Sequence, residues 1–128
     1  MKNILFVCIE NSNRSQMAQA FANIYQTDKV KAYSSGSKPS GKINPKAITA
    51  MQELGYDLTT HDFKSLYEIP QIEYEYAITM GCSDECPFVK ARHREDWQLP
   101  DPRHIEGEEF NKIRDKIKKK VLDLLQKL

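Results

Sequence analysis

The first fifteen residues hold the feature that most restricts the fold, a cysteine followed after five residues by an arginine and a serine. Cys8 ends a continuous apolar run, Ile4–Val7, which predicts a buried strand. Gln16–Tyr25 carries apolar side chains at helical spacing, so Arg14 and Ser15 open a helix. A strand, a short loop and a helix in this order turn backbone N–H groups toward the positive end of the helix dipole. The sequence therefore predicts an anion-binding loop that begins at Cys8.

The side chains of this loop fit a nucleophilic site for a tetrahedral anion. The N–H donors and the helix N-terminus favour the thiolate form of Cys8, and Ser15 can donate a hydrogen bond to its sulfur. Arg14 supplies a planar fork that matches two oxygens of such an anion. The alternative is a buried structural cysteine and a surface arginine, because cysteine is among the most buried residue types. That alternative does not explain an arginine and a serine at the start of the helix.

Cys-x5-Arg-Ser directly after the first strand resembles the low-molecular-weight tyrosine phosphatases. Within that superfamily, Asn11-Ser12 and Arg14-Ser15-Gln16-Met17-Ala18 look most like the arsenate reductases that use a cysteine cascade. The resemblance implies that the loop binds the substrate through the residues Glu10, Asn11, Ser12, Asn13, Arg14 and Ser15. Glu10 stands where the phosphatases usually carry glycine. We expect its side chain to face out, because a carboxylate inside the loop would repel an anion.

Length and composition narrow the class of protein. With 128 residues we expect one domain, 1–128. The 19 basic and 18 acidic residues give a net charge of +1, which makes no case for nucleic acid or a membrane surface. No apolar run approaches a membrane span and the N-terminus is not a signal peptide, so we expect a cytoplasmic protein, and a monomer. Three cysteines fit reduced, reactive thiols better than a disulfide framework.

Strand and helix patterns alternate along the rest of the chain. Apolar runs predict further strands over Val30–Ser35, Glu75–Met80 and Trp97–Leu99. Helices are predicted from Pro45 to a stop at Gly55, over Ser65–Ile69 before Pro70, and over Glu108–Leu128, whose lysine face we expect to be solvated. The alternation predicts an α/β three-layer sandwich, with a four-stranded parallel sheet and helices on both faces. Ligands of such sheets bind at the carboxyl ends of the strands. His61 is expected to be a surface or packing residue.

Two further cysteines, Cys82 and Cys86, follow the third strand and so lie at the same sheet edge as Cys8. Helical residues four apart have Cβ atoms about 5–6 Å apart. A disulfide needs roughly 3.5–4.5 Å, so a bridge requires a loop that refolds on oxidation. The alternatives are a zinc site with His93 and His104 at irregular spacing, a static disulfide, and two inert thiols. The reductases resembled here carry such a pair after the third strand.

Asp101 stands between two prolines, in a stiff turn that fixes the direction of its side chain. It is either a plain turn residue or the acid that protonates the leaving oxygen of a tetrahedral anion. Asp-Pro late in the chain matches the general acid of the family resembled. The phosphatases typically follow it with aromatic residues, whereas this chain has Arg103-His104, which suits a small bare anion.

These features together, with the roles that the resemblance implies, predict an arsenate reductase. Cys8 attacks arsenate, Arg14 and the loop hold it, Asp101 is the acid, and Cys82 and Cys86 relay the oxidation. We expect no tightly bound cofactor and no metal, reducing equivalents from thioredoxin or a glutaredoxin-like protein, and a weak phosphatase side activity. The first alternative is a low-molecular-weight protein tyrosine phosphatase that uses Cys8, Arg14 and Asp101 alone. The second is a module that binds an oxyanion or phosphopeptide without catalysis.

Overall fold

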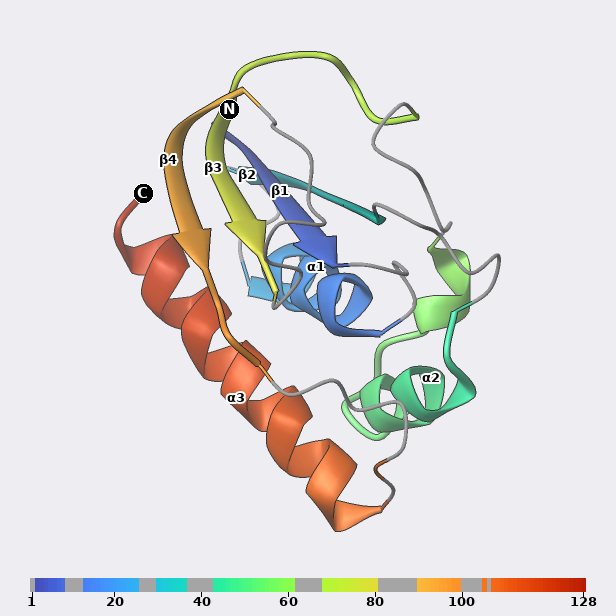
Figure 1. Ribbon diagram of the computed structural model, residues 1–128. Helices are drawn as coiled ribbons and strands as arrows, with labels where there is room; N and C mark the ends of the chain where they lie inside the picture. Colours follow the sequence, from blue (N-terminus) through green and yellow to red (C-terminus); the bar gives the residue numbers. More distant parts are fainter. Residues whose placement is uncertain are drawn as a thin grey trace.

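The computed structural model describes residues 2–8, 13–25, 30–36, 43–61, 68–80, 90–99, 105 and 107–128. The strands are β1 (Lys2–Cys8), β2 (Val30–Gly36), β3 (Tyr74–Thr79) and β4 (Ala91–Asp96). The helices are α1 (Arg14–Tyr25), α2 (Pro45–Gln52), the short 3-10 helix η1 (Leu58–Thr60) and α3 (Glu108–Gln126). Figure 1 shows the strands side by side, with α1 and α3 packed along the sheet and α2 beyond α1.

The four strands form one parallel sheet in the order β2-β1-β3-β4, as predicted (Figure 1). Cys8, the last residue of β1, is in register with Gly36 of β2. Val7 is in register with Thr79 of β3. The carboxyl ends of these three strands therefore meet at one edge of the sheet, and Cys8 lies at its middle. This is the edge at which parallel sheets bind their ligands.

Alternate side chains of β1 enter two different cores, as the two-residue repeat of a strand requires. Ile4, Phe6 and Cys8 join the larger core, to which α1, α2 and α3 all contribute. Leu5 and Val7 join a smaller core on the opposite face. The three α-helices of the described residues thus pack on the Phe6 side of the sheet. Residues 65–67 of the helix predicted over Ser65–Ile69 lie outside the described part of the chain, and residues 68–69 form a bend.

The start of α2 matches the prediction from Asn44-Pro45. The Asn44 side chain accepts a hydrogen bond of 2.9 Å from the backbone N–H of Lys46, and Pro45 occupies the first helical turn. The helix ends at Gln52. Gly55 follows with φ at +81°, a left-handed conformation that glycine adopts without steric cost. Local sequence signals are therefore sufficient to place this helix.

The last strand lies elsewhere than predicted. It spans Ala91–Asp96 and pairs with β3, whereas Trp97–Leu99 follows it without strand structure. Most side chains of β4 are polar and exposed because it is an edge strand, and charged side chains on an edge oppose pairing with other chains. Trp97 and Leu99 are apolar because both are buried in the larger core. Apolar character therefore indicated the buried residues correctly but not the strand.

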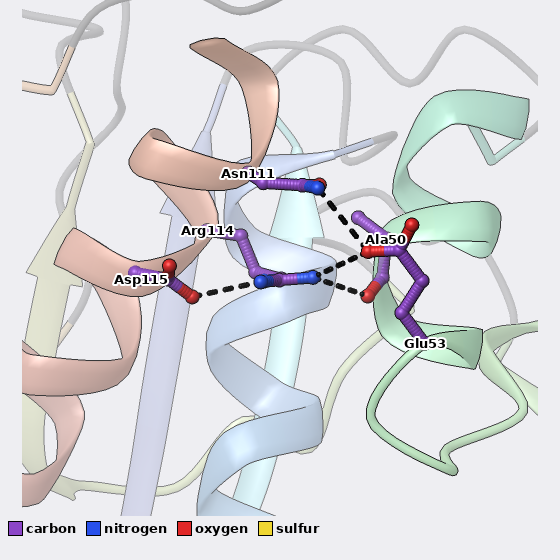
Figure 2. A network of polar contacts seen from close by, with 5 residues as sticks. All are labelled: Ala50, Glu53, Asn111, Arg114 and Asp115. Atoms are coloured by element: carbon purple, nitrogen blue, oxygen red, sulfur yellow. Dashed lines mark hydrogen bonds and ion pairs between the residues drawn. The ribbon is translucent and has the colours of Figure 1, made fainter. Parts of the chain in front are cut away.

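The last helix, α3, buries its predicted apolar stripe and exposes Lys112, Lys116, Lys119 and Lys120. Its buried face also holds Arg114, which sequence reasoning missed. Its Nη1 atom donates to the Ala50 carbonyl at 2.9 Å and to Glu53 Oε2 at 3.0 Å. Figure 2 shows both contacts. Arg114 thereby fastens α3 to the end of α2. Within the described residues, no helix combines the length and the apolar character needed to cross a membrane.

Candidate functional site

The thiol of Cys8 lies against the first turn of α1. Its Sγ atom is 2.9 Å from Oγ of Ser15, and both residues are buried. β1 ends at Cys8 and α1 starts at Arg14, so the contact joins the last residue of the strand to the first turn of the helix. The predicted hydrogen bond between the serine hydroxyl and the sulfur is present in this geometry.

Asn13 organises the start of α1. Its carbonyl accepts the first helical hydrogen bond, 2.9 Å from the N–H of Met17. Its side-chain oxygen accepts a hydrogen bond of 2.7 Å from the N–H of Arg14. The first turn of the helix holds no acidic residue that would cancel the positive end of its dipole. No carboxylate within this turn therefore offsets the positive end of the helix dipole beside Cys8.

Arg14 is a buried residue, with a relative exposure of 5%. Its Nη1 atom donates to the carbonyl of Leu99 at 2.9 Å. Its Nε atom is buried and has no hydrogen-bond partner within the described part of the chain. A buried polar atom without a partner costs about 1–3 kcal/mol, and more when the group is charged. The Nε–H of this guanidinium is therefore a place where an anionic ligand gains a hydrogen bond.

A group of polar side chains contacts the first turn of α1 through Gln16. His61 Nδ1 lies 2.9 Å from Gln16 Oε1, and its Nε2 lies 2.5 Å from the Tyr56 hydroxyl. Tyr56 also accepts a hydrogen bond of 3.2 Å from Asn23. His61 is thus a partly buried packing residue, in line with the sequence prediction. Nothing in its sequence context indicated the contact with Gln16.

The structure describes four of the predicted site residues and brings them together at one sheet edge: Cys8, Asn13, Arg14 and Ser15. The other predicted residues lie outside the described part of the chain: Glu10, Asn11, Ser12, Cys82, Cys86 and Asp101. The Leu99 carbonyl also takes part in this arrangement, because it accepts a hydrogen bond from Arg14. No pattern of side chains in the sequence could reveal it. Within the described residues, no cluster of three His, Cys, Asp or Glu side chains could hold a metal ion.

A thiol, a hydroxyl and a guanidinium lie together at the N-terminus of α1, an arrangement that suits nucleophilic chemistry on a tetrahedral oxyanion. The family model described as low molecular weight phosphotyrosine protein phosphatase matches residues 3–128. The chain belongs to this family.

Comparisons with individual proteins agree with this assignment. The chain is 34% identical to the glutaredoxin arsenate reductase of Synechocystis sp., over 100% of this chain and 99% of that one. A solved arsenate reductase in its phosphate-binding state is 35% identical, with a TM-score of 0.90 and coverage of 99% and 98% of the two chains. A thioredoxin-dependent arsenate reductase of Corynebacterium glutamicum is 28% identical, with a TM-score of 0.80, over 99% of this chain and 61% of that one.

Proposed function

We propose that this protein reduces arsenate to arsenite through a cascade of its three cysteines. One observation carries the proposal most directly. The buried Arg14 guanidinium is fixed by Leu99 on one side and unpaired at Nε, beside a helix start whose Ser15 touches the Cys8 sulfur. A tetrahedral oxyanion provides the acceptors that this edge lacks. The arsenate reductase relatives indicate which oxyanion.

In the proposed first step, the Cys8 thiolate attacks arsenate and a sulfur–arsenic bond forms. The hydroxyl that leaves arsenic takes a proton from Asp101 and departs as water. Arg14 and the backbone N–H groups of residues 10–15 hold the remaining oxygens. The hydrogen bond between Ser15 and the Cys8 sulfur stabilises the attacking thiolate.

In the second step, the Cys82 thiolate attacks the sulfur of Cys8. A Cys8–Cys82 disulfide forms, and the electron pair of the sulfur–arsenic bond goes to arsenic, which leaves as arsenite. Cys86 then attacks Cys82 and releases the Cys8 thiolate, so the oxidation ends in a Cys82–Cys86 disulfide. An external dithiol reduces this bond and completes the cycle.

The external reductant is a thioredoxin- or glutaredoxin-type protein. The names of two relatives support this class of donor, since one is a glutaredoxin arsenate reductase and the other is thioredoxin-dependent. A parallel assay with thioredoxin and with glutaredoxin, each with its own NADPH-coupled reductase, determines which of them this protein accepts.

The variant Cys86→Ser tests the cascade. The account predicts one arsenite released per protein molecule and then no further turnover, because the Cys8–Cys82 disulfide cannot be passed on. Cys8→Ser is the matched control and should release none. Sustained turnover by Cys86→Ser would show that the third cysteine has no part in the reaction.

The family match also favours a second function, a protein tyrosine phosphatase that needs only Cys8, Arg14 and Asp101. Phosphate and arsenate are similar tetrahedral anions, so weak phosphatase activity is expected of the reductase as well. The dependence on Cys82 separates the two. A phosphatase keeps its activity in Cys82→Ser and shows no turnover of arsenate.

A further inference from the structure

The orientation of Arg14 depends on a backbone carbonyl that comes from the other end of the chain. Arg14 Nη1 donates to the Leu99 carbonyl at 2.9 Å, and this contact is buried. A guanidinium is planar, so a bond that fixes one of its nitrogens restricts the direction of the whole group. The contact therefore determines where the unpartnered Nε points. If Leu99 moves, the anion-facing edge of Arg14 moves with it.

Leu99 itself is fixed by Trp97. The N–H of Leu99 donates to the Trp97 carbonyl at 2.7 Å, which closes a tight turn. The N–H of Trp97 donates to the Thr79 carbonyl at 2.7 Å, at the end of β3. The backbone at 97–99 is thus tied to the carboxyl edge of the sheet. No strand pairing continues past Asp96 within the described residues, so this turn depends on its own anchors.

The side chain of Trp97 makes three contacts that hold this turn in place. Its ring packs against Phe6 of β1, with centroids 5.9 Å apart. Its indole N–H donates to Glu95 Oε1 at 3.1 Å. Lys120 of α3 places its Nζ atom 5.6 Å from the ring centroid, within cation–π range. Trp97 is 5% exposed, so these contacts hold a nearly buried side chain in one place.

We propose that Trp97 is a positioning residue for oxyanion binding. It holds the Leu99 carbonyl against Arg14, so that the unpartnered Nε of the guanidinium is already aimed at the anion before the anion arrives. The inference rests on the proposed function, because it concerns the same anion site. Pre-orientation of this kind lowers the cost of ordering on binding, so its loss weakens affinity without removing any group that touches the ligand.

The test uses the full-length reduced protein and inorganic phosphate as the probe. Isothermal titration calorimetry gives the phosphate Kd, and steady-state assays give KM and kcat for arsenate. The variants are Trp97→Leu, which removes all three anchors, and Trp97→Phe, which keeps a ring against Phe6. Phe110→Leu is the matched control, since Phe110 is a buried aromatic residue of the same core at the start of α3. All measurements are made well below the Tm of each variant.

For Trp97→Leu we expect the phosphate Kd and the arsenate KM to rise about tenfold, equal to about 1.4 kcal/mol, with a smaller change in kcat. For Trp97→Phe the phosphate Kd and the arsenate KM should stay within about threefold of the wild-type values, because a swap between aromatic rings is tolerated better than truncation. Phe110→Leu should lower Tm and leave the phosphate Kd unchanged.

A phosphate Kd that is unchanged in Trp97→Leu, with a fall in Tm like that of Phe110→Leu, would overturn the positioning role. Arsenate turnover by the wild type in that case would leave the proposed function intact. Weaker phosphate binding by Trp97→Leu with no arsenate turnover by the wild type would support the positioning role and contradict the proposed function. The two proposals therefore fail in different measurements.

Discussion

Cys8 Sγ lies 2.9 Å from Ser15 Oγ, although one residue ends a strand and the other stands in the first turn of a helix. The contact joins the two parts of the candidate anion site, the end of β1 and the start of α1. At this distance the hydroxyl, which the helix holds in place, can donate a hydrogen bond to the sulfur.

Replacement of Ser15 by alanine should slow the reaction of Cys8. A hydrogen bond to a charged group contributes about 1.5–3 kcal/mol, so we expect at least a roughly tenfold slower alkylation by iodoacetamide and a similar fall in kcat. The fold should persist, which circular dichroism can check. Alkylation at the wild-type rate would show that the serine does not act on the sulfur.

Replacement by alanine should change the free energy of unfolding differently at two adjacent serines of β2. Ser34 donates to Gln19 Oε1 at 2.6 Å, so Ser34→Ala should lower the free energy of unfolding by about 1 kcal/mol. Ser35 Oγ is buried and has no partner within the described residues, so Ser35→Ala should be neutral or stabilise by up to about 1 kcal/mol. Urea denaturation measures both. Clear destabilisation by Ser35→Ala would mean that its hydroxyl is bonded in solution.

Arg114 should be worth more to stability than any exposed ion pair of α3. The Ala50 carbonyl that it binds is left without its helical partner, because the Leu54 N–H donates to Met51 instead. Arg114→Ala should therefore lower the free energy of unfolding by about 2 kcal/mol. The control Lys112→Ala breaks an exposed pair with Glu109 and should stay within about 0.5 kcal/mol of the wild type. Equal losses of stability in the two variants would contradict the proposal that Arg114 caps the Ala50 carbonyl at the end of α2 (Figure 2).

Stability should fall in alkali partly through Tyr74. Burial, with a smaller contribution from Tyr33, raises the pKa of Tyr74 from 10.0 to about 12. The unfolded chain then ionises at a lower pH than the native protein, so this contribution is complete below pH 10 and is lost as the pH rises toward 12. Tyr74→Phe removes the hydrogen bond to the Pro70 carbonyl and should cost about 1 kcal/mol at neutral pH. Urea denaturation from neutral to alkaline pH should show that the free energy of unfolding falls less steeply with pH in Tyr74→Phe than in the wild type. Parallel falls in the two proteins would contradict the raised pKa of Tyr74.

Much of the fold could be predicted because local and periodic signals agree. The continuous apolar run before Cys8, the cap at Asn44 and the stripe of α3 each specify an element without tertiary information. β4 could not be found in this way, since an edge strand with polar side chains has no apolar period. Trp97 and Leu99 were misassigned for the converse reason, because burial made them apolar outside any strand.

The site was predictable where its residues are close in sequence. Cys8, Arg14 and Ser15 share one loop and helix start, so their spacing alone indicates the geometry. The bond from Arg14 to the Leu99 carbonyl spans 85 positions and involves a backbone atom, so no side-chain pattern encodes it. Arg114 was missed because a single charge within an apolar stripe is normally read as a solvated position.

The most direct test of the account is arsenate-dependent NADPH oxidation with thioredoxin and thioredoxin reductase, and in parallel with the glutaredoxin system. The wild type is compared with Cys82→Ser, and hydrolysis of para-nitrophenyl phosphate is followed in both. The account predicts arsenate-dependent turnover in the wild type, none in Cys82→Ser, and the same weak phosphatase activity in each. No arsenate-dependent turnover with either donor, alongside phosphatase activity indifferent to the substitution, would contradict it and identify a phosphatase.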